Sequence, residues 1–503
     1  MNRIASTIAL AATIAPIAAQ RIVASHTLHP TQTVQMLRPA VDTNDDGVDD
    51  FVAVVRSHTG STYGIFVVDG SNGAILRQLG AALPFAPLDV IGFGDGDGDG
   101  HGDIAVTHSN TIVYSGATGA VLYTQNQRFL SMCALGDYDG NGSADFAGVW
   151  YNNNGQNIVM LLRGENATPF SSLPPISNPH ADCILRNAGD VSGDGRDDLA
   201  ISPEDGATVV LHSVTGAIEN FISMPGPNEN SRTIETIDLD GDGLREVFVL
   251  RQDAIDRIDI HDGATGQLWF GLSAPPGNAT NDFARNVCGV GDLDCDGFVD
   301  FVSLVPGASG ALHAFSGSTG NVLWRFETPL EALGSYLCPL PDIDGDGYSD
   351  FVASYGSYNS GGPPGTGWQL VSSLIVAEAT DIGGACGGGP FLPQLGMSRP
   401  ILGQTTTISL LHGPLGTNGV LAFSLQPSWP TYLGASSCSA GFDMGNAMAL
   451  YLPTEPNWSY SIPLPLVHEL AGIPIALQCF YSPTSGALGM DLSNAIWARV
   501  GFQ

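Results

Sequence analysis

Seven nonapeptides in this 503-residue chain carry the side chains best suited to chemistry. They begin at Asp42, Asp95, Asp137, Asp190, Asp238, Asp292 and Asp342. Each has Asp at position 1, Asp, Asn or Ser at position 3, Asp or Asn at position 5, Gly at position 6 and Asp or Glu at position 9. The motifs hold 28 of the 50 acidic residues. Two like charges about 4 Å apart repel by roughly 1 kcal/mol in water and about 4 kcal/mol at an effective dielectric of 20, so the crowding indicates a bound cation.

Oxygen ligands at alternate positions of a tight turn favour calcium. Calcium accepts about six to eight oxygens in loose geometry, whereas magnesium requires a tighter octahedron with retained water. Solvated acidic turns are the alternative, but seven matches to one pattern favour metal sites. We therefore expect up to seven calcium ions, one per repeat. The expected ligands are Asp42, Asn44, Asp46, Asp50, Asp95, Asp97, Asp99, Asp103, Asp137, Asp139, Asn141, Asp145, Asp190, Ser192, Asp194, Asp198, Asp238, Asp240, Asp242, Glu246, Asp292, Asp294, Asp296, Asp300, Asp342, Asp344, Asp346 and Asp350.

The residues around the motifs indicate which elements hold them. An EF-hand requires a glutamate at position 12 and flanking helices. Position 12 is instead occupied by Ala53, Val106, Gly148, Ile201, Val249, Ser303 and Ala353. Position 10 is always apolar and opens a strand-like segment. The motifs begin 42 to 54 residues apart, and most intervals hold two further strand-like segments around a Thr-Gly turn, as in Ile112 to Tyr123. This spacing fits a four-stranded propeller blade whose metal loop joins two strands.

These repeats resemble the FG-GAP or VCBS repeats of the integrin alpha-subunit N-terminal propeller and of many secreted bacterial proteins. The resemblance covers about residues 21–380, and the segment from Gly307 to Phe315 is similar to the GAP segment of that family. It implies a seven-bladed β-propeller with calcium in its strand-connecting loops. Integrin propellers carry such loops in only some blades, so seven loops are a departure. Position 3 of the fourth motif is Ser192 rather than Asp or Asn, and we expect that site to be the weakest.

We expect an all-β fold, a seven-bladed β-propeller with a C-terminal antiparallel β-sandwich-like domain. The expected division is a signal peptide at 1–19, the propeller at 20–380, a linker at 381–390 and a C-terminal β domain of unassigned function at 391–503.

The seventh repeat lacks a clear fourth strand. Residues 21–42 align without a gap with residues 321–342. Ile22 to His26 is therefore expected to complete the last blade, which removes two exposed strand edges.

The eight cysteines show no CxxC spacing. Those of the propeller can pair between neighbouring blades or remain buried thiols. The candidate pairs are Cys133–Cys183, Cys288–Cys338 and Cys438–Cys479, the last of which leaves Cys386 over.

Composition excludes several classes of function. The net charge is −33 and all 17 basic residues are arginine, which disfavours nucleic-acid binding and polybasic membrane docking. Without lysine the chain has no Schiff-base amine and no Walker A lysine. No segment after the signal peptide has about 18 uninterrupted apolar residues, so we expect no transmembrane segment. We expect a secreted or cell-surface monomer.

The sequence predicts an extracellular module that binds protein or glycan. Trp150, Tyr151, Tyr355 and Tyr358 are candidates for stacking on sugars, with ordinary blade packing as the alternative. The other function that we consider is a polysaccharide-active enzyme, a lyase or hydrolase on a propeller scaffold. No catalytic residue is assigned.

Overall fold

The computed structural model shows β-strands and no α-helix in the residues that it describes. These are residues 22–152, 154–173, 183–203, 208–212, 218–223, 231–251, 257–273, 283, 286–294, 296–305, 311–327, 333–345, 347–356, 366–373, 378–383, 385–387, 391–415, 417–425, 427–432, 439–442, 447–452, 455–465, 470, 473–482, 484 and 490–501. The predicted signal peptide lies outside them. Within these ranges no helix is long and apolar enough to cross a membrane. The chain forms two compact units, Gln20–Leu374 and Ile375–Gln503.

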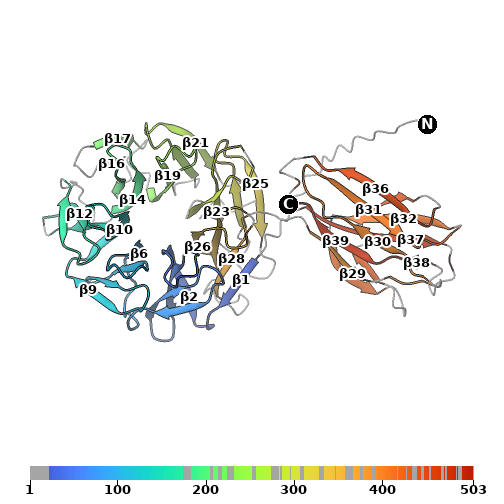
Figure 1. The fold of residues 1–503 in the computed structure, drawn as a ribbon, viewed down its shortest axis with the longest axis horizontal. Helices are drawn as coiled ribbons and strands as arrows, with labels where there is room; N and C mark the ends of the chain where they lie inside the picture. The colour runs from blue at the N-terminus through green and yellow to red at the C-terminus, as the bar shows by residue number, and fades with distance from the viewer. Residues whose placement is uncertain are drawn as a thin grey trace. The chain divides into compact units, whose positions relative to one another are not determined.

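Seven four-stranded antiparallel sheets make up the described part of the first unit and follow one another around a ring (Figure 1). Six of them consist of four consecutive strands each. The first three are β2 (Gln32–Pro39), β3 (Phe51–Ser57), β4 (Thr62–Val68) and β5 (Ile75–Gln78); β6 (Asp89–Gly94), β7 (Asp103–Thr107), β8 (Thr111–Tyr114) and β9 (Val121–Gln125); and β10 (Phe129–Gly136), β11 (Asp145–Tyr151), β12 (Asn157–Leu162) and β13 (Pro169–Ser172).

The next three sheets repeat this order. They are β14 (Cys183–Gly189), β15 (Asp198–Pro203), β16 (Thr208–His212) and β17 (Ile218–Ser223); β18 (Ser231–Ile237), β19 (Glu246–Arg251), β20 (Arg257–His261) and β21 (Leu268–Ser273); and β22 (Val287–Gly291), β23 (Asp300–Val305), β24 (Ala311–Phe315) and β25 (Val322–Glu327). The first strand of each sheet contacts the first strand of the next, and β26 (Leu333–Leu340) contacts β2. These contacts close the ring, and the unit is a β-propeller.

The last sheet joins the two ends of the propeller sequence. Its order is β1 (Ile22–Thr27), β28 (Gly367–Val371), β27 (Asp350–Tyr355) and β26. Strand β1 pairs antiparallel with β28, from Ile22 opposite Val371 to Thr27 opposite Gly367. The predicted closure is therefore confirmed.

The hydrophobic core of the propeller lies between neighbouring sheets. Second strands such as β3 and β19 are buried along most of their length, because both of their faces meet another sheet. One cluster combines Phe51 and Val55 of the first sheet with Val352, Trp368 and Leu370 of the last. Equivalent clusters join the neighbouring sheets from the first to the sixth, so each of these sheets is buried only when its neighbour is in place.

The described part of the second unit contains three β-sheets, two of which share a core. One sheet has the order β29 (Glu378–Gly383), β39 (Ala495–Arg499), β37 (Pro474–Ser482), β32 (Asn418–Ser424) and β35 (Met448–Tyr451), with β38 (Asp491–Leu492) paired to β37. A smaller sheet consists of β30 (Gln394–Met397), β31 (Thr405–Leu411) and β36 (Trp458–Pro463). A separate two-stranded sheet consists of β33 (Pro427–Tyr432) and β34 (Ser439–Phe442). Leu410 and Trp458 of the smaller sheet share a hydrophobic cluster with Leu477 and Ile496 of the larger one. Two sheets that share a core form a sandwich, as predicted.

The boundary between the units differs from the expected one at residue 380. Strand β29 pairs with β39, which places it in the second unit, and the boundary falls after Leu374. The segment 381–390, which we interpreted as a linker, therefore begins inside a strand. The glycine-rich composition of this segment is typical of a linker. Its pairing with β39, near the C-terminus, leaves no signal in the local sequence.

The structure corrects the disulfide expectations. Cys386 is disulfide-bonded, whereas Cys479 is a buried thiol. The expected Cys438–Cys479 disulfide, which left Cys386 unpaired, is therefore wrong. Cys438 itself lies outside the described residues. Cys133, Cys183, Cys288 and Cys338 of the propeller are also buried thiols, which agrees with the alternative to inter-blade disulfides, and Cys295 lies outside the described residues.

Candidate metal sites

Each acidic motif forms the loop between the first and second strands of a propeller sheet. In most sheets the second strand begins at position 9 of the motif, as β7 begins at Asp103 and β23 at Asp300. The loops therefore all lie at the same end of their sheets. Position 9 is buried in every loop, whereas most of the other acidic positions are partly or fully exposed.

A hydrogen bond from position 6 shapes all seven loops. The backbone N–H of the glycine donates to the carboxylate of position 1 over 2.7 to 3.1 Å. These glycines have φ between 86° and 94°, a conformation that other residues rarely adopt. A Cβ at any of them would have no atom within 4 Å, so conformation rather than space selects glycine. The turn directs the carboxylate of position 1 into the loop.

Position 5 forms a second turn inside the loop. Its side-chain oxygen accepts a hydrogen bond from the backbone N–H of position 7, as Asp99 does from His101 at 2.9 Å and Asp242 from Leu244 at 2.7 Å. The same bond occurs in every loop except the seventh, whose position 5, Asp346, lies outside the described residues.

The carboxylate of position 9 holds the two ends of the loop together. One of its oxygens accepts a hydrogen bond from a backbone N–H at position 2 or 3. The pairs are Thr43 to Asp50 at 2.9 Å, Gly96 to Asp103 at 3.0 Å, Tyr138 to Asp145 at 3.0 Å, Ser192 to Asp198 at 2.7 Å, Leu239 to Glu246 at 2.6 Å, Leu293 to Asp300 at 2.6 Å and Ile343 to Asp350 at 3.0 Å.

The other oxygen of position 9 binds the segment that follows the third strand, which is the turn to the fourth strand in the sheets of four consecutive strands. The donors are the backbone N–H groups of Gly70 to Asp50 at 3.0 Å, Gly116 to Asp103 at 3.1 Å, Gly164 to Asp145 at 3.1 Å, Gly317 to Asp300 at 2.9 Å and Ser373 to Asp350 at 2.9 Å. The position-9 acid thus connects the metal loop with the segment that follows the third strand of the same sheet.

The folded loops bring most of the predicted ligands together. In five loops, three carboxylates each offer an oxygen that lies within 4.8 Å of the other two. These groups are Asp95, Asp97 and Asp99; Asp137, Asp139 and Asp145; Asp238, Asp240 and Glu246; Asp292, Asp294 and Asp300; and Asp342, Asp344 and Asp350. Each group is able to hold a metal ion.

The other two loops have fewer carboxylates at these positions. Position 3 is Asn44 in the first loop and Ser192 in the fourth, which leaves three predicted acidic ligands in each. In the second loop the grouped acids are at positions 1, 3 and 5, and Asp103 at position 9 is not among them. The loops therefore share one backbone design but differ in the oxygens that they gather.

Position 3 supplies the clearest sign that a ligand fits. Oδ1 of Asp139 and Oγ of Ser192 are buried and accept no hydrogen bond from the described residues. A buried polar atom without a partner is costly. A cation in the loop would provide the missing partner, so the residues present fit a metal ion.

Burial and hydrogen bonding act in opposite directions on the loop acids. Burial raises the pKa of Asp103 to about 6 and the pKa values of Glu246 and Asp300 to about 7, although backbone N–H donors oppose the rise. At position 1 of the first loop, burial also raises the pKa of Asp42, but N–H donors led by Gly47 outweigh it and the net shift is downward. Without a cation, the ionised form of these position-9 acids is therefore destabilised by burial.

Sequence reasoning missed the glycine that opens the Thr-Gly turn. A Cβ at Gly116 would lie 1.7 Å from the carbonyl oxygen of Gly102 in the metal loop, and a Cβ at Gly317 would lie 2.0 Å from that of Val299. Only glycine lets the turn approach the loop closely enough for its N–H to reach position 9. The recurring glycine before the Thr-Gly pair was visible in the sequence, but its contact was not.

The aromatic residues proposed for sugar stacking contribute to blade packing. Tyr355 is 2% exposed, and its hydroxyl donates to the carbonyl of His26 at 3.1 Å. Trp150 packs against the hydrophobic cluster between the second and third sheets. Tyr151 is half-buried, and Tyr358 lies outside the described residues. Blade packing thus accounts for Trp150 and Tyr355.

No protein-family model matches the chain, and no curated protein matches it. Solved structures that match include crystal structures of BBS1N in complex with ARL6DN, one soaked with lead and one with mercury. Each is 10% identical and covers 72% of this chain and 94% of that chain, with TM-scores of 0.45 and 0.44. The class of this protein is defined by its own ring of sheets: it is an all-β propeller protein with acidic loops that can hold metal ions.

Proposed function

We propose that the chain is a calcium-stabilised propeller that acts outside the cell as a binding or adhesion module for a protein or a glycan. The main observation behind this proposal is the geometry of the acidic loops, five of which bring three carboxylate oxygens within 4.8 Å of one another. The proposed ions occupy up to seven loops, one per sheet, with the predicted ligands at positions 1, 3, 5 and 9.

Calcium fits these loops better than a smaller ion. Much of the hydrogen-bonding capacity of positions 1 and 9 is already used by backbone N–H groups. These bonds fix the shape of the loop, while three carboxylate oxygens remain close enough to one another to bind an ion. Calcium tolerates such irregular oxygen shells, whereas magnesium retains water and prefers a near-ideal octahedron.

A binding role is supported by the end of the sheets that faces away from the metal loops. There the connection between second and third strands varies from the short one between Thr107 and Thr111 to the long one between Tyr355 and Gly367. Connections of variable length on a rigid scaffold commonly carry recognition. The proposed extracellular setting draws on the predicted signal peptide and on the disulfide of Cys386, a bond typical of oxidising compartments.

Arrays of proteins and glycans, probed with the calcium-loaded protein, test the binding role. Saturable binding without consumption of the ligand supports a binding module. Progressive depolymerisation of a glycan would instead show a polysaccharide-active enzyme and overturn the proposal. The enzyme was our alternative from the sequence, and no feature of the described residues favours it.

A further inference from the structure

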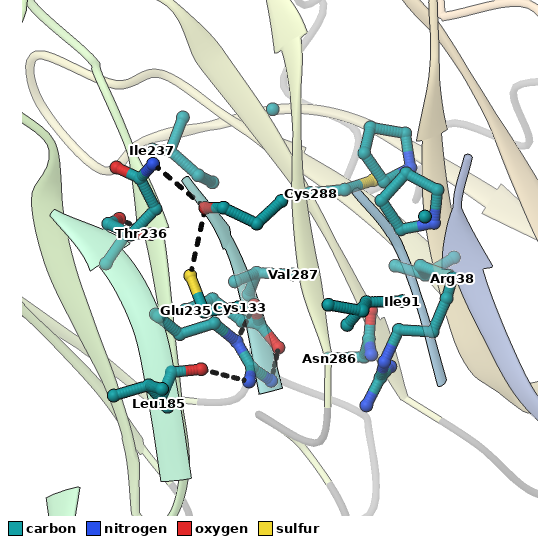
Figure 2. A pocket seen from close by; sticks show the side chains of 18 of the residues that line it. Arg38, Ile91, Cys133, Leu185, Glu235, Thr236, Ile237, Asn286, Val287 and Cys288 are labelled. Atoms are coloured by element: carbon teal, nitrogen blue, oxygen red, sulfur yellow. Dashed lines mark hydrogen bonds and ion pairs between the residues drawn. The ribbon is translucent and has the colours of Figure 1, made fainter. Parts of the chain in front are cut away.

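The centre of the propeller contains a cavity of about 330 Å³ that is separate from the metal-ligating positions. Its wall is built by the first strand of each sheet, so every sheet contributes (Figure 2). Apolar side chains such as Ile91, Met132 and Val287 form part of this wall. The volume suits a ligand of the size of a single sugar ring.

The cavity is positively charged, although the chain as a whole is strongly acidic. Its lining includes three arginines, Arg38, Arg186 and Arg245, but only two acids, Asp89 and Glu235. The chain has 17 arginines and 50 acids, so this ratio runs opposite to that of the molecule. A positive cavity inside an acidic protein selects for an anionic ligand.

Arg186 does not take part in binding, because Glu235 already satisfies it. Its Nε and Nη2 donate to the two carboxylate oxygens of Glu235 at 2.8 and 2.9 Å. Its Nη1 donates to the carbonyl of Leu185 at 2.9 Å. This pair spans two neighbouring sheets and forms a neutral part of the wall.

Arg38 is bound much less completely. Its Nε lies 3.5 Å from Oδ1 of Asp89, and its Nη1 donates to the carbonyl of Leu37 at 3.2 Å. Nη2 donates to none of the described residues. Asp89 meanwhile accepts hydrogen bonds from the backbone N–H groups of Val90 and Met132, so part of its charge is already compensated. The Arg38 guanidinium therefore retains N–H donors for a ligand.

Two further polar side chains line the same cavity. Asn286 offers an amide, and Arg245 is an exposed side chain next to the position-9 acid of the fifth metal loop. Arginine binds carboxylates through two parallel N–H groups, and an amide can bind either a carboxylate oxygen or a hydroxyl.

We propose that the central cavity binds a small hydroxylated carboxylate, of the size and chemistry of a uronic acid, through Arg38. The Nη groups of Arg38 hold the carboxylate, Asn286 binds a hydroxyl, and the apolar wall contacts the face of the sugar ring. The proposal goes beyond the proposed metal sites and uses none of their ligands.

Calorimetric titration with D-glucuronate and D-glucose, in buffer with saturating calcium chloride in both cell and syringe, tests this site. The two sugars differ in whether carbon 6 is a carboxylate, and the constant calcium removes chelation as a source of heat. We expect glucuronate to bind at least tenfold more tightly than glucose. Equal affinities, or no binding of glucuronate at millimolar concentration, would overturn the proposal.

Substitutions assign the binding to Arg38. Arg38→Gln should weaken glucuronate binding at least tenfold and leave the glucose signal unchanged, and Arg38→Lys should restore part of the affinity. Arg56→Gln is the matched control, because Arg56 lies over the ring of Tyr63 and does not line the cavity. If Arg38→Gln fails to fold, Asn286→Ala provides the same test with a smaller expected loss. Unchanged glucuronate affinity in a folded Arg38 or Asn286 variant would refute the site.

Discussion

The carboxylates of one metal loop perform different tasks. Position 1 accepts the glycine N–H that shapes the turn, as Asp238 does from Gly243, and position 5 fixes position 7. Position 9 is buried and holds the two ends of its loop together, as Glu246 does by accepting the N–H of Leu239. At position 3 one oxygen accepts the N–H of position 5, as Asp240 does from Asp242, and the other oxygen is left for an ion. The loop motif is therefore a folding motif and a ligand set at the same time.

Asp240→Asn tests this division of tasks. It removes one charge from the acidic group of the fifth loop without changing the size of the side chain, so we expect about a tenfold loss of calcium affinity at one site, which is about 1.4 kcal/mol, and an intact fold. Asp45→Asn is the control, because Asp45 lies outside the ligand positions, is exposed and has a φ of 64° that asparagine tolerates. Calcium titration of both variants is the measurement, and equal effects of the two would contradict the assignment.

The buried position-9 acids predict a pH dependence for the metal-free protein. Burial raises the pKa values of Glu246 and Asp300 to about 7 in the folded state, above their ordinary values of 4.5 and 3.8. A raised folded pKa favours the protonated folded protein. These groups therefore contribute full stability below about pH 4, and the contribution is lost as the pH rises to about 7, by up to about 1.4 kcal/mol per pH unit for each group.

Denaturant unfolding between pH 5 and pH 8, in buffer free of divalent ions, measures this trend. The free energy of unfolding should fall with rising pH without calcium and change much less with calcium bound, since the ion stabilises the ionised acids. A metal-free protein that becomes more stable from pH 5 to pH 8 would show that these acids are not strained.

At the level of strands and loops, the second, third and sixth metal loops each donate a backbone hydrogen bond to the loop of the preceding sheet. Ala144 of the third loop donates its N–H to the carbonyl of Asp95 in the second at 2.8 Å, and Val299 of the sixth donates to Leu239 of the fifth at 2.7 Å. An ion that orders one loop therefore also supports the edge of its neighbour. In these sheets the neighbouring loops are therefore connected rather than independent of one another.

Gly116→Ala tests the contact between the second metal loop and its Thr-Gly turn. The new Cβ would lie 1.7 Å from the carbonyl oxygen of Gly102, so the backbone must move and the bond from Gly116 to Asp103 must weaken. We expect a loss of about 1 to 3 kcal/mol in the free energy of unfolding, together with weaker binding of one calcium ion.

The matched control for this substitution is Gly60→Ala. A Cβ at Gly60 would meet only Thr62, at 3.6 Å, and the expected change is within about 0.5 kcal/mol. Chemical denaturation of both variants decides the question. Equal stability of the two would mean that the close approach at Gly116 is unimportant.

The sequence predicted the elements that show a local or repeated pattern, including the pairing of β1 with β28, and it missed contacts that leave no such pattern. The acidic loops, the strand after each loop and the Thr-Gly turns all carry a local signature, and the structure confirms them. The contact between Gly116 and the second loop, and the pairing of β29 with β39, are made between segments far apart in sequence. The orphaned oxygens at position 3 likewise depend on side-chain burial, which the motif alone does not specify.

For the propeller as a whole, the decisive feature is the closure between its two ends. Trp368 of β28 is fully buried, its ring stacks on His26 of β1 with centroids 4.6 Å apart, and its Nε1 donates to the carbonyl of Gly73 in the first sheet at 3.0 Å. The N-terminal strand thus joins the last sheet where that sheet meets the first. This closure was predictable because the alignment of residues 21–42 with 321–342 repeats the blade pattern.

A chain that begins at Leu28 and so lacks β1 tests the closure. It leaves the edge of β28 unpaired and exposes part of the cluster around Trp368, so we expect the free energy of unfolding to fall by about 2 kcal/mol or more and the protein to self-associate. The reference is the chain that begins at Gln20. Thermal denaturation and light scattering compare the two, and equal melting temperatures with no association would contradict the role of β1.

The central claim is that the acidic loops bind calcium and stabilise the ring, and a calcium titration of the metal-free protein with parallel thermal denaturation tests it most directly. The account predicts between five and seven bound ions per chain, from the five grouped loops and the two loops with Asn44 or Ser192 at position 3. It also predicts a marked rise in melting temperature, since each ion at a hundredfold excess over its dissociation constant contributes about 2.7 kcal/mol. Identical melting with and without calcium, and no stoichiometric uptake of the ion, would contradict it.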